Sequence, residues 1–169
     1  MAYASGGQLT LQGVVSTLDA VDTTAKQPIG LEVPDNAGNI YKYMQGVASV
    51  VAGDWCVFGA DGTVARALNT PLAGPMGVAM AAIVANTYGW FQIVGKISTA
   101  GNGQTQANIA TGITSGAPLF LTATAGRLNG TAAAGSAVLG AWAASTAASN
   151  LGDAVINRPF APGFTLASA

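Results

Sequence analysis

The sequence contains no histidine and only one cysteine, Cys56, among its 169 residues. Histidine is the commonest general base and metal ligand near neutral pH, so its absence removes the usual centre of acid–base and metal chemistry. A single cysteine allows no internal disulfide. Cys56 lies in the apolar stretch DWCVFG, where we expect a packed, unreactive thiol, because reactive thiols need electropositive and accessible surroundings.

Motifs that carry catalysis or ligand binding are also missing. The sequence has no CxxC, HExxH or Walker-type glycine loop. The stretch GNGQTQ (101–106) has no lysine, which favours a flexible loop over a phosphate cradle. Four acidic residues of the first quarter lack the spacing of an EF-hand loop and are expected on a solvated face: Asp19, Asp22, Glu32 and Asp35. We therefore expect no enzyme, no cofactor and no metal site.

Charge is scarce throughout the chain. Charged residues make up 8% of the sequence, against about 25% in an ordinary soluble domain, and the net charge is −1. Runs of 29 and 30 uncharged residues separate Arg66 from Lys96 and Lys96 from Arg127. Such a chain has no basic field to attract nucleic acid. Since surface charge normally keeps soluble monomers apart, we expect much of this surface to be covered by other subunits.

Half of the residues are hydrophobic, but many are small, including 34 alanines. The uncharged stretch GPMGVAMAAIVANTYGWFQIVG (74–95) is interrupted by glycine, proline and asparagine, whereas a membrane-spanning helix needs about 20 consecutive apolar residues. It predicts two strands, 76–84 and 88–97, joined by a turn. The start MAYASGGQLTLQG shows no secretory signal, and no membrane partner is expected.

Short strands also dominate elsewhere. The stretches 7–16 and 39–49 alternate apolar and polar residues, which is typical of half-buried strands, and Asp61-Gly62 is a hairpin signal. Nearly every expected element is short and bounded by Gly, Asn, Asp or Pro. The sequence therefore predicts a mainly all-β protein resembling a sandwich or barrel, with Trp55 and Trp90 in its core.

An internal sequence repeat, called the echo below, indicates that the fold is built from two related β units. The stretch AGDWCVF (52–58) matches SGAPLFL (115–121). Four pairs of identical residues recur at a shift of 63 positions: Gly53/Gly116, Gly77/Gly140, Gly89/Gly152 and Ile93/Ile156. Glycine recurs where backbone geometry or close packing requires it, so these matches indicate a duplication.

The echo divides the chain into five expected parts within one compact domain. They are an N-terminal arm with the first strand or strands (1–38), a first β unit (39–98), a connector (99–115), a second β unit (116–157) and a C-terminal tail (158–169). The two ends are expected to be irregular, and the arm 1–12 and the tail are the segments expected to become ordered on docking to a partner.

The stretch YKYMQGVASVVAGDWCVFGADGTVARA, followed by GPMGVAMAAIVANTYGWFQIVG, resembles the small capsid decoration (cement) proteins of tailed bacteriophages. Those proteins share a Tyr-x-Tyr strand, an alanine–glycine turn leading into a Gly-Asp strand, a later Gly-Val-Ala strand and a Tyr-Gly-Trp hairpin. The matching positions here are Tyr41 and Tyr43, Gly53–Val57, Gly77–Ala79 and Tyr88–Gly95. The resemblance covers 41–95 well and 116–157 weakly, and it transfers no active-site residue.

The resemblance implies a structural virion protein, made in the host cytoplasm, that binds the outer surface of a phage capsid and reinforces contacts between major capsid subunits. The implied partners are the major capsid protein and other copies of the chain, as a homotrimer or alternatively a homodimer. Arg66, Arg127 and Arg158 are candidates for pairing between subunits, since arginine suits interfaces. The residues expected at capsid or subunit interfaces are Tyr3, Leu9, Leu11, Arg127, Trp142, Arg158, Phe160 and Phe164.

Two alternatives use the same β architecture. A phage tail or fibre component, or another carbohydrate-binding β module, could stack sugars on its tryptophans and would bind glycans in isolation. A secreted or shell-forming bacterial structural protein would self-assemble without any capsid. The sequence alone leaves both open.

Overall fold

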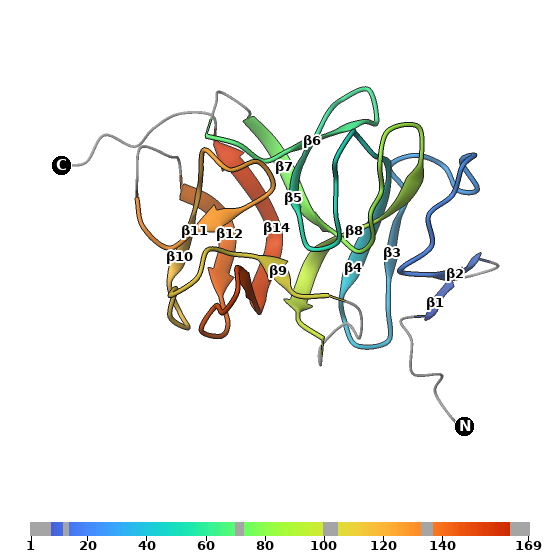
Figure 1. Cartoon of the computed structure of the whole chain (residues 1–169). Coiled ribbons are helices and arrows are strands. Elements are labelled where there is room, and N and C mark those ends of the chain that lie inside the picture. The colour runs from blue at the N-terminus through green and yellow to red at the C-terminus, as the bar shows by residue number, and fades with distance from the viewer. Residues whose placement is uncertain (1–7, 12–13, 70–72, 100–104, 133–136, 163–169) are drawn as a thin grey trace.

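The computed structural model describes residues 8–11, 14–69, 73–99, 105–132 and 137–162. Within these ranges the chain forms fourteen strands and no helix, so the prediction of an all-β fold is confirmed (Figure 1). None of the described residues therefore forms a helix that could cross a membrane.

The strands of the first half are β1 (Gln8–Leu11), β2 (Val14–Thr17), β3 (Glu32–Pro34), β4 (Ile40–Gln45), β5 (Trp55–Phe58), β6 (Val64–Arg66), β7 (Ala73–Ala79) and β8 (Tyr88–Ile97). Those of the second half are β9 (Ala107–Asn108), β10 (Pro118–Leu121), β11 (Leu128–Asn129), β12 (Ala137–Ala143), β13 (Leu151–Gly152) and β14 (Ala154–Pro162). Strands β1 and β2 form a separate two-stranded sheet.

Five strands of the first unit close into a small barrel. Antiparallel pairing runs in the order β4, β8, β7, β5 and β6. A parallel bridge between Gln45 and Thr63 then brings the end of β4 back to the start of β6. At this seam the Gln45 N–H donates to the Gly62 carbonyl at 3.1 Å. Closure removes the free edges that an open sheet would expose.

The second unit repeats this arrangement. Strand β9 pairs with β13, which leads directly into β14, and β14 is followed by β12, β10 and β11. A parallel bridge between Ile109 and Leu128 closes the circuit, as in the first unit. Figure 1 shows the two units side by side, the first in blue and green and the second in yellow to red.

The register of β4 against β8 repeats at the shift of 63 that the sequence predicts, whereas the ladders that β10 forms with β11 and β12, and β12 forms with β14, are displaced by one or two residues. In β4 and β8, Met44 pairs with Gly89; in β9 and β13, Ala107 pairs with Gly152. Backbone positions in the left-handed region recur at the same shift, as in the pairs Ser49/Gly112, Gly53/Gly116, Asn86/Ser149 and Gly95/Arg158. Because the same unusual backbone angles recur at equivalent places, the two units share one fold as well as a sequence pattern.

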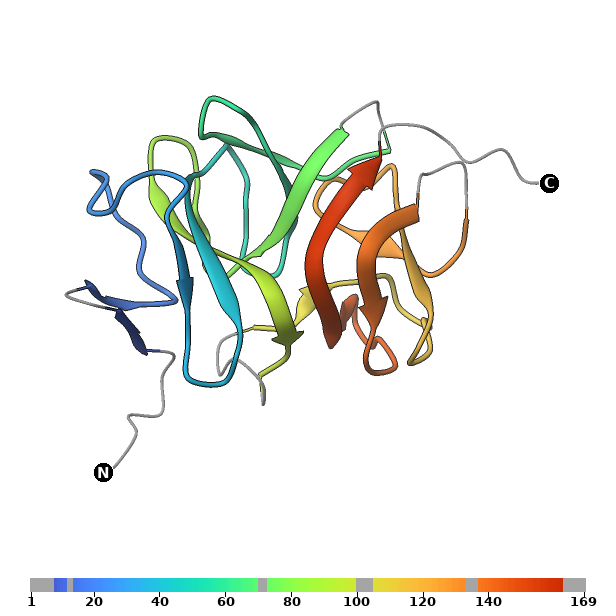
Figure 2. The same ribbon diagram turned by 180° about the vertical axis from the view of Figure 1, so that it is seen from behind.

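Strand β14 joins the two units into one sheet. Its residues 154–157 pair with 94–97 of β8, and its residues 160–162 pair with 73–75 of β7. Seen from behind in Figure 2, the red β14 lies between the orange β12 and the green β7. Trp55 and Trp90 are fully buried, as predicted, in a cluster that also contains Leu119 and Ile156 of the second unit.

The two barrels also interlock at the seam of the second. There, two backbone groups of the second unit bond to the first unit. They are the N–H of Asn108, which lies 63 positions after Gln45, and the carbonyl of Gly126, which lies 64 positions after Gly62. The Asn108 N–H donates to the Gly53 carbonyl at 2.8 Å, and the Trp55 N–H donates to the Gly126 carbonyl at 3.0 Å. The segment Gly53–Trp55 of the first barrel is therefore held between β9 and the turn before β11.

Several elements differ from the sequence predictions. Residues 158–162, expected in an irregular tail, continue β14. Pro159 is tolerated because it falls where the strand changes partner from β8 to β7, and Pro162 is its last residue, so neither interrupts a continuous ladder. The stretch 7–16 forms parts of two strands, the connector contains β9, and the strand expected at 76–84 spans Ala73–Ala79 instead.

Candidate interaction surface

Three exposed apolar residues form a row across three adjacent strands. Leu139 on β12 pairs with Phe160 on β14, and Phe160 pairs with Pro75 on β7. Residues directly opposite each other in an antiparallel ladder project from the same face of the sheet. Leu139 is 53% exposed and Phe160 41%, and Pro75 is also exposed. The sheet therefore presents a line of apolar side chains to solvent.

A second row lies further along the same strands. Trp142 on β12 is opposite Val155 on β14 and Pro118 on β10. Its neighbours Ala141 and Ala143 are buried, so the alternation of the strand turns Trp142 outward, where it is 42% exposed.

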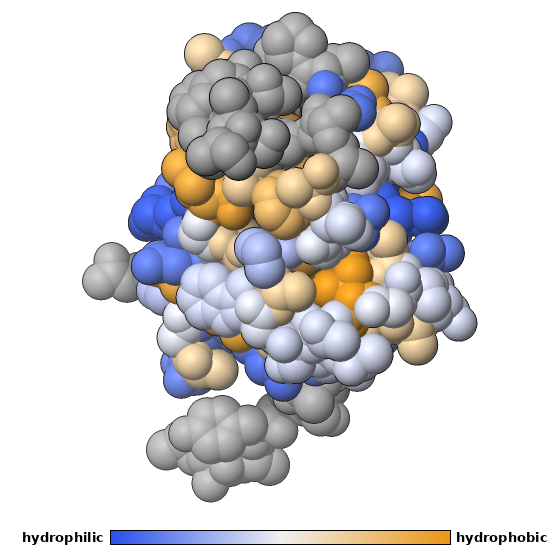
Figure 3. Space-filling view, turned by 90° about the vertical axis from the view of Figure 1, so that its left-hand side faces the viewer, coloured by the Kyte–Doolittle hydropathy of each residue, from blue (hydrophilic) through white to orange (hydrophobic). Residues whose placement is uncertain are grey.

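We call the two rows together the apolar face; its members are Pro75, Pro118, Leu139, Trp142, Val155 and Phe160. No charged residue occurs between Arg127 and Asp153, so most of β12 and its flanking loops are neutral. Figure 3 looks at the side formed by the second unit, where most strongly hydrophilic atoms lie near the margins and apolar atoms are scattered across the middle. Large apolar side chains aligned on one exposed face of a sheet favour interaction with a partner.

The apolar face contains two of the residues that the sequence predicts at an interface, Trp142 and Phe160. Leu139 was missed because its exposure depends on the irregularity at Gly140, where the register of β12 against β14 shifts and φ is 71°. The echo of Gly77 and Gly140 was visible in the sequence, but it did not indicate that Gly140 would turn Leu139 outward.

The other predicted interface residues are not members of the apolar face, although Arg158 lines a small hollow together with Pro75. Arg158 is 58% exposed and forms an ion pair with Glu32, with Nη2 2.8 Å from Oε2. Arg127 is half-buried, and its Nε donates to Asn108 Oδ1 at 3.1 Å. Tyr3 and Phe164 lie outside the described residues, and Leu9 and Leu11 lie in β1, where the structure describes the backbone alone.

A second candidate site is a buried carboxylate at the junction of the units. Asp54 Oδ2 accepts hydrogen bonds from Arg66 Nε at 2.8 Å and from the Val51 N–H at 3.1 Å. Asp54 Oδ1 accepts one from Asn108 Nδ2 at 3.1 Å. Since its oxygens are engaged by these donors, Asp54 holds the junction together and offers no reactive group. Arg66, like Arg127 and Arg158, thus has a partner within its own chain.

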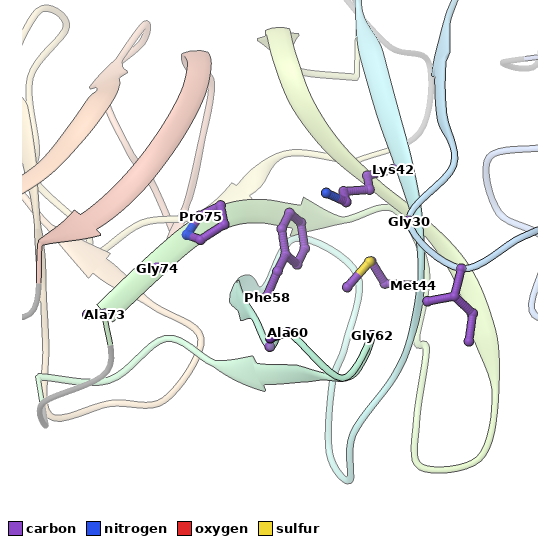
Figure 4. A pocket seen from close by; sticks show the side chains of 11 residues that line it. Gly30, Lys42, Met44, Phe58, Ala60, Gly62, Ala73, Gly74 and Pro75 are labelled. Atoms are coloured by element: carbon purple, nitrogen blue, oxygen red, sulfur yellow. The ribbon is translucent and has the colours of Figure 1, made fainter.

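A groove of about 590 Å³ opens beside the start of β7. Phe58 and Met44 form its floor, and Figure 4 shows Lys42 and Pro75 flanking the Phe58 ring. The Lys42 Nζ atom lies 5.6 Å from the centre of that ring and 3.5 Å from Glu32 Oε1. Hydrogen bonding from Arg158 lowers the pKa of Glu32 below its ordinary value, so this carboxylate stays ionised between two cations.

No cluster of three or more potential metal ligands occurs among the described residues. The chain matches no family model, no curated protein and no solved structure.

Proposed function

We propose that the protein is a structural virion protein that binds the outer surface of a phage capsid and reinforces contacts between major capsid subunits. The observation that carries the proposal is the apolar face, exposed on a chain in which only 8% of residues are charged. The resemblance of residues 41–95 to capsid decoration proteins names the class of partner. It also implies that copies of the chain associate, as a homotrimer or a homodimer.

Under this proposal, the protein stabilises the capsid by mass action. A protein that binds the assembled shell but not free subunits makes disassembly harder by the free energy of its contacts. Many copies on one shell add their contributions, so each contact can be modest. The apolar face suits this role because Trp142 and Phe160 supply large, rigid contact area, and aromatic residues are enriched in the centres of interfaces.

The test is co-sedimentation of the purified protein with bare phage heads, together with the mass of the free oligomer. We expect the wild-type protein to sediment with the heads and the double variant Trp142→Ser/Phe160→Ser to lose at least about tenfold in affinity, as for two interface anchors. The matched control is Leu151→Ser: Leu151 is 42% exposed but lies on β13, outside the apolar face. Equal loss in both variants would contradict the assignment of the face.

The same purified protein also distinguishes capsid binding from the two alternative functions. Binding to an immobilised glycan panel with no binding to heads would favour a tail, fibre or carbohydrate-binding protein. Among the tryptophans, Trp55 and Trp90 are buried and only Trp142 is exposed, so the multi-tryptophan platform that this alternative invokes does not form. Self-assembly into large structures without heads would favour the shell-forming alternative.

A further inference from the structure

The groove beside β7 is unfilled in the part of the chain that the structure describes, although its floor consists of large apolar side chains. We propose that residues 163–169 of the same chain, GFTLASA, occupy this groove. The proposal concerns a docking site that adjoins the apolar face at Pro75, and it does not depend on capsid binding.

The first argument is position. The last residue of β14, Pro162, pairs with Ala73 at the start of β7. Ala73, Gly74 and Pro75 form one side of the groove, so residue 163 follows directly at its rim. Seven extended residues reach up to about 23 Å, which is ample for a segment that starts at the edge of the site. Gly163 can adopt backbone angles that other residues avoid, which allows the chain to turn from the ladder into the groove.

The second argument is chemistry. In an extended segment Phe164 and Leu166 project to the same side, because side chains alternate with a period of two. The groove offers Phe58, Met44 and Ile29 as apolar contacts. Lys42 is the only charged residue that lines it, and its ammonium group is engaged by Glu32 and the Phe58 ring. The side chains of the segment are all uncharged, so they bring no charge into the groove.

The third argument is shape. Four glycines line the groove: Gly30, Gly59, Gly62 and Gly74. At Gly30 nothing lies within 4 Å of where a Cβ atom would be, so another backbone can approach closely there. A volume of about 590 Å³ corresponds to about 20 water molecules at about 30 Å³ each, which is room for a short peptide rather than for a single side chain.

The experiment traps the docked segment with a disulfide in the full-length chain. The variant Ala60→Cys/Ser168→Cys places one thiol in the groove lining and one in the segment. In the control, Ser115→Cys replaces Ala60→Cys. Ser115 is exposed and precedes Gly116, whose N–H bonds to Ala143 at the end of β12 remote from Phe160. The native Cys56 does not compete, because it is buried and burial raises the pKa of its thiol.

With oxidised glutathione as oxidant, we expect the Ala60→Cys/Ser168→Cys chain to form an intramolecular disulfide at least about tenfold faster than the control, from its higher effective concentration. Mass spectrometry of the non-reduced monomer identifies the bond. Adding Phe164→Asp/Leu166→Asp should reduce the rate to that of the control. Equal rates in the groove variant and the control, or no effect of the aspartates, would overturn the proposal. A disulfide between chains would overturn it in favour of the segment of a neighbouring copy.

A second measurement is independent of cysteine substitution. Hydrogen exchange at Gly59–Gly62 is compared between the full-length protein and a variant that ends at Pro162. The proposal predicts faster exchange at this turn in the shortened chain, with an unchanged melting temperature. It also predicts that added GFTLASA peptide slows the exchange again. Identical exchange in the two proteins would contradict it.

Discussion

The carboxylate of Asp54, fully buried, lies 2.8 Å from the Nε atom of Arg66, which is 26% exposed at the junction of the two barrels. The second unit has no such pair: Ala117 occupies the position equivalent to Asp54 at the shift of 63. There, a shallow hollow lined by Ala117, Asn129 and Gly130 remains open. The ion pair therefore occurs only in the first unit, in the segment Gly53–Trp55 that is hydrogen-bonded to the second barrel.

Replacement of Asp54 should be among the most destabilising single changes in the chain. Asp54→Ala removes three hydrogen bonds and leaves the Asn108 amide and the Val51 N–H without their acceptor. We expect a loss of about 3 kcal/mol in the free energy of unfolding, measured by urea denaturation, as when one partner of a buried pair is removed. Asp19→Ala makes the same change of net charge at an exposed position and should cost less than about 0.5 kcal/mol. Similar losses in both would show that the junction does not depend on Asp54.

The two related units offer a matched test of the interlock. Gly53 and Gly116 occupy equivalent turns, with φ of 87° and 83°, so alanine is strained at both to a similar extent. A Cβ atom at Gly53 would collide with the carbonyl oxygen of Gln106, whereas a Cβ atom at Gly116 would meet nothing within 4 Å. We therefore expect Gly53→Ala to lower the free energy of unfolding by about 1–3 kcal/mol more than Gly116→Ala, the usual cost of overpacking. Equal losses would mean that only backbone strain matters.

Tyr43 should make the fold sensitive to alkali. Its hydroxyl donates to Asp22 Oδ2 at 2.7 Å, and burial, reinforced by this bond, raises the pKa of Tyr43 to about 12. In the unfolded chain the pKa is about 10, so the stability that depends on neutral Tyr43 is complete below pH of about 10 and is lost as the pH rises towards 12. Tyr43→Phe should lower stability at neutral pH by about 1 kcal/mol, because Asp22 loses a donor.

In Tyr43→Phe, the free energy of unfolding should fall less steeply with rising pH than in the wild type. Some decrease should remain, because burial also raises the pKa of Tyr41. The measurement is urea unfolding across the alkaline range, with phenolate absorbance followed in parallel. An unchanged alkaline slope in Tyr43→Phe would exclude this tyrosine as the cause.

Deletion of residues 1–8 should lower occupancy on phage heads while leaving the melting temperature unchanged. Only Gln8 of this segment belongs to a described strand. That strand, β1, pairs with β2 in a sheet separate from the ten-stranded sheet that contains β7, β8, β12 and β14. The arm can therefore contribute to docking without contributing to the main core. Normal co-sedimentation of the shortened protein would remove the arm from the docking mechanism.

The sequence predicts strands well where local signals are strong. Residues Tyr88–Ile97 form the expected strand, because aromatic and β-branched residues dominate its middle and a turn precedes it. The start of β7 was missed because Gly74 and Pro75 have the composition of a turn, although pairing with β14 holds them extended. That pairing connects residues more than 80 positions apart, and no local pattern encodes it.

The apolar face and the groove beside β7 likewise depend on contacts between residues far apart in the sequence. The ion pair between Glu32 and Arg158 spans 126 positions, and the apolar face is assembled from β7, β10, β12 and β14. Trp142 and Phe160 could be named as interface residues from their type, but their alignment on one face required the register. The groove was not predictable, because it is defined by the space left between β4, β5 and β7.

Because the second barrel completes its seam with backbone groups of Gly53 and Trp55, neither half of the chain has all its hydrogen-bond partners within its own boundaries. Two units that share such hydrogen bonds should unfold together rather than independently. Calorimetry should record a single cooperative transition, and the halves made as separate polypeptides should fold poorly unless they are mixed.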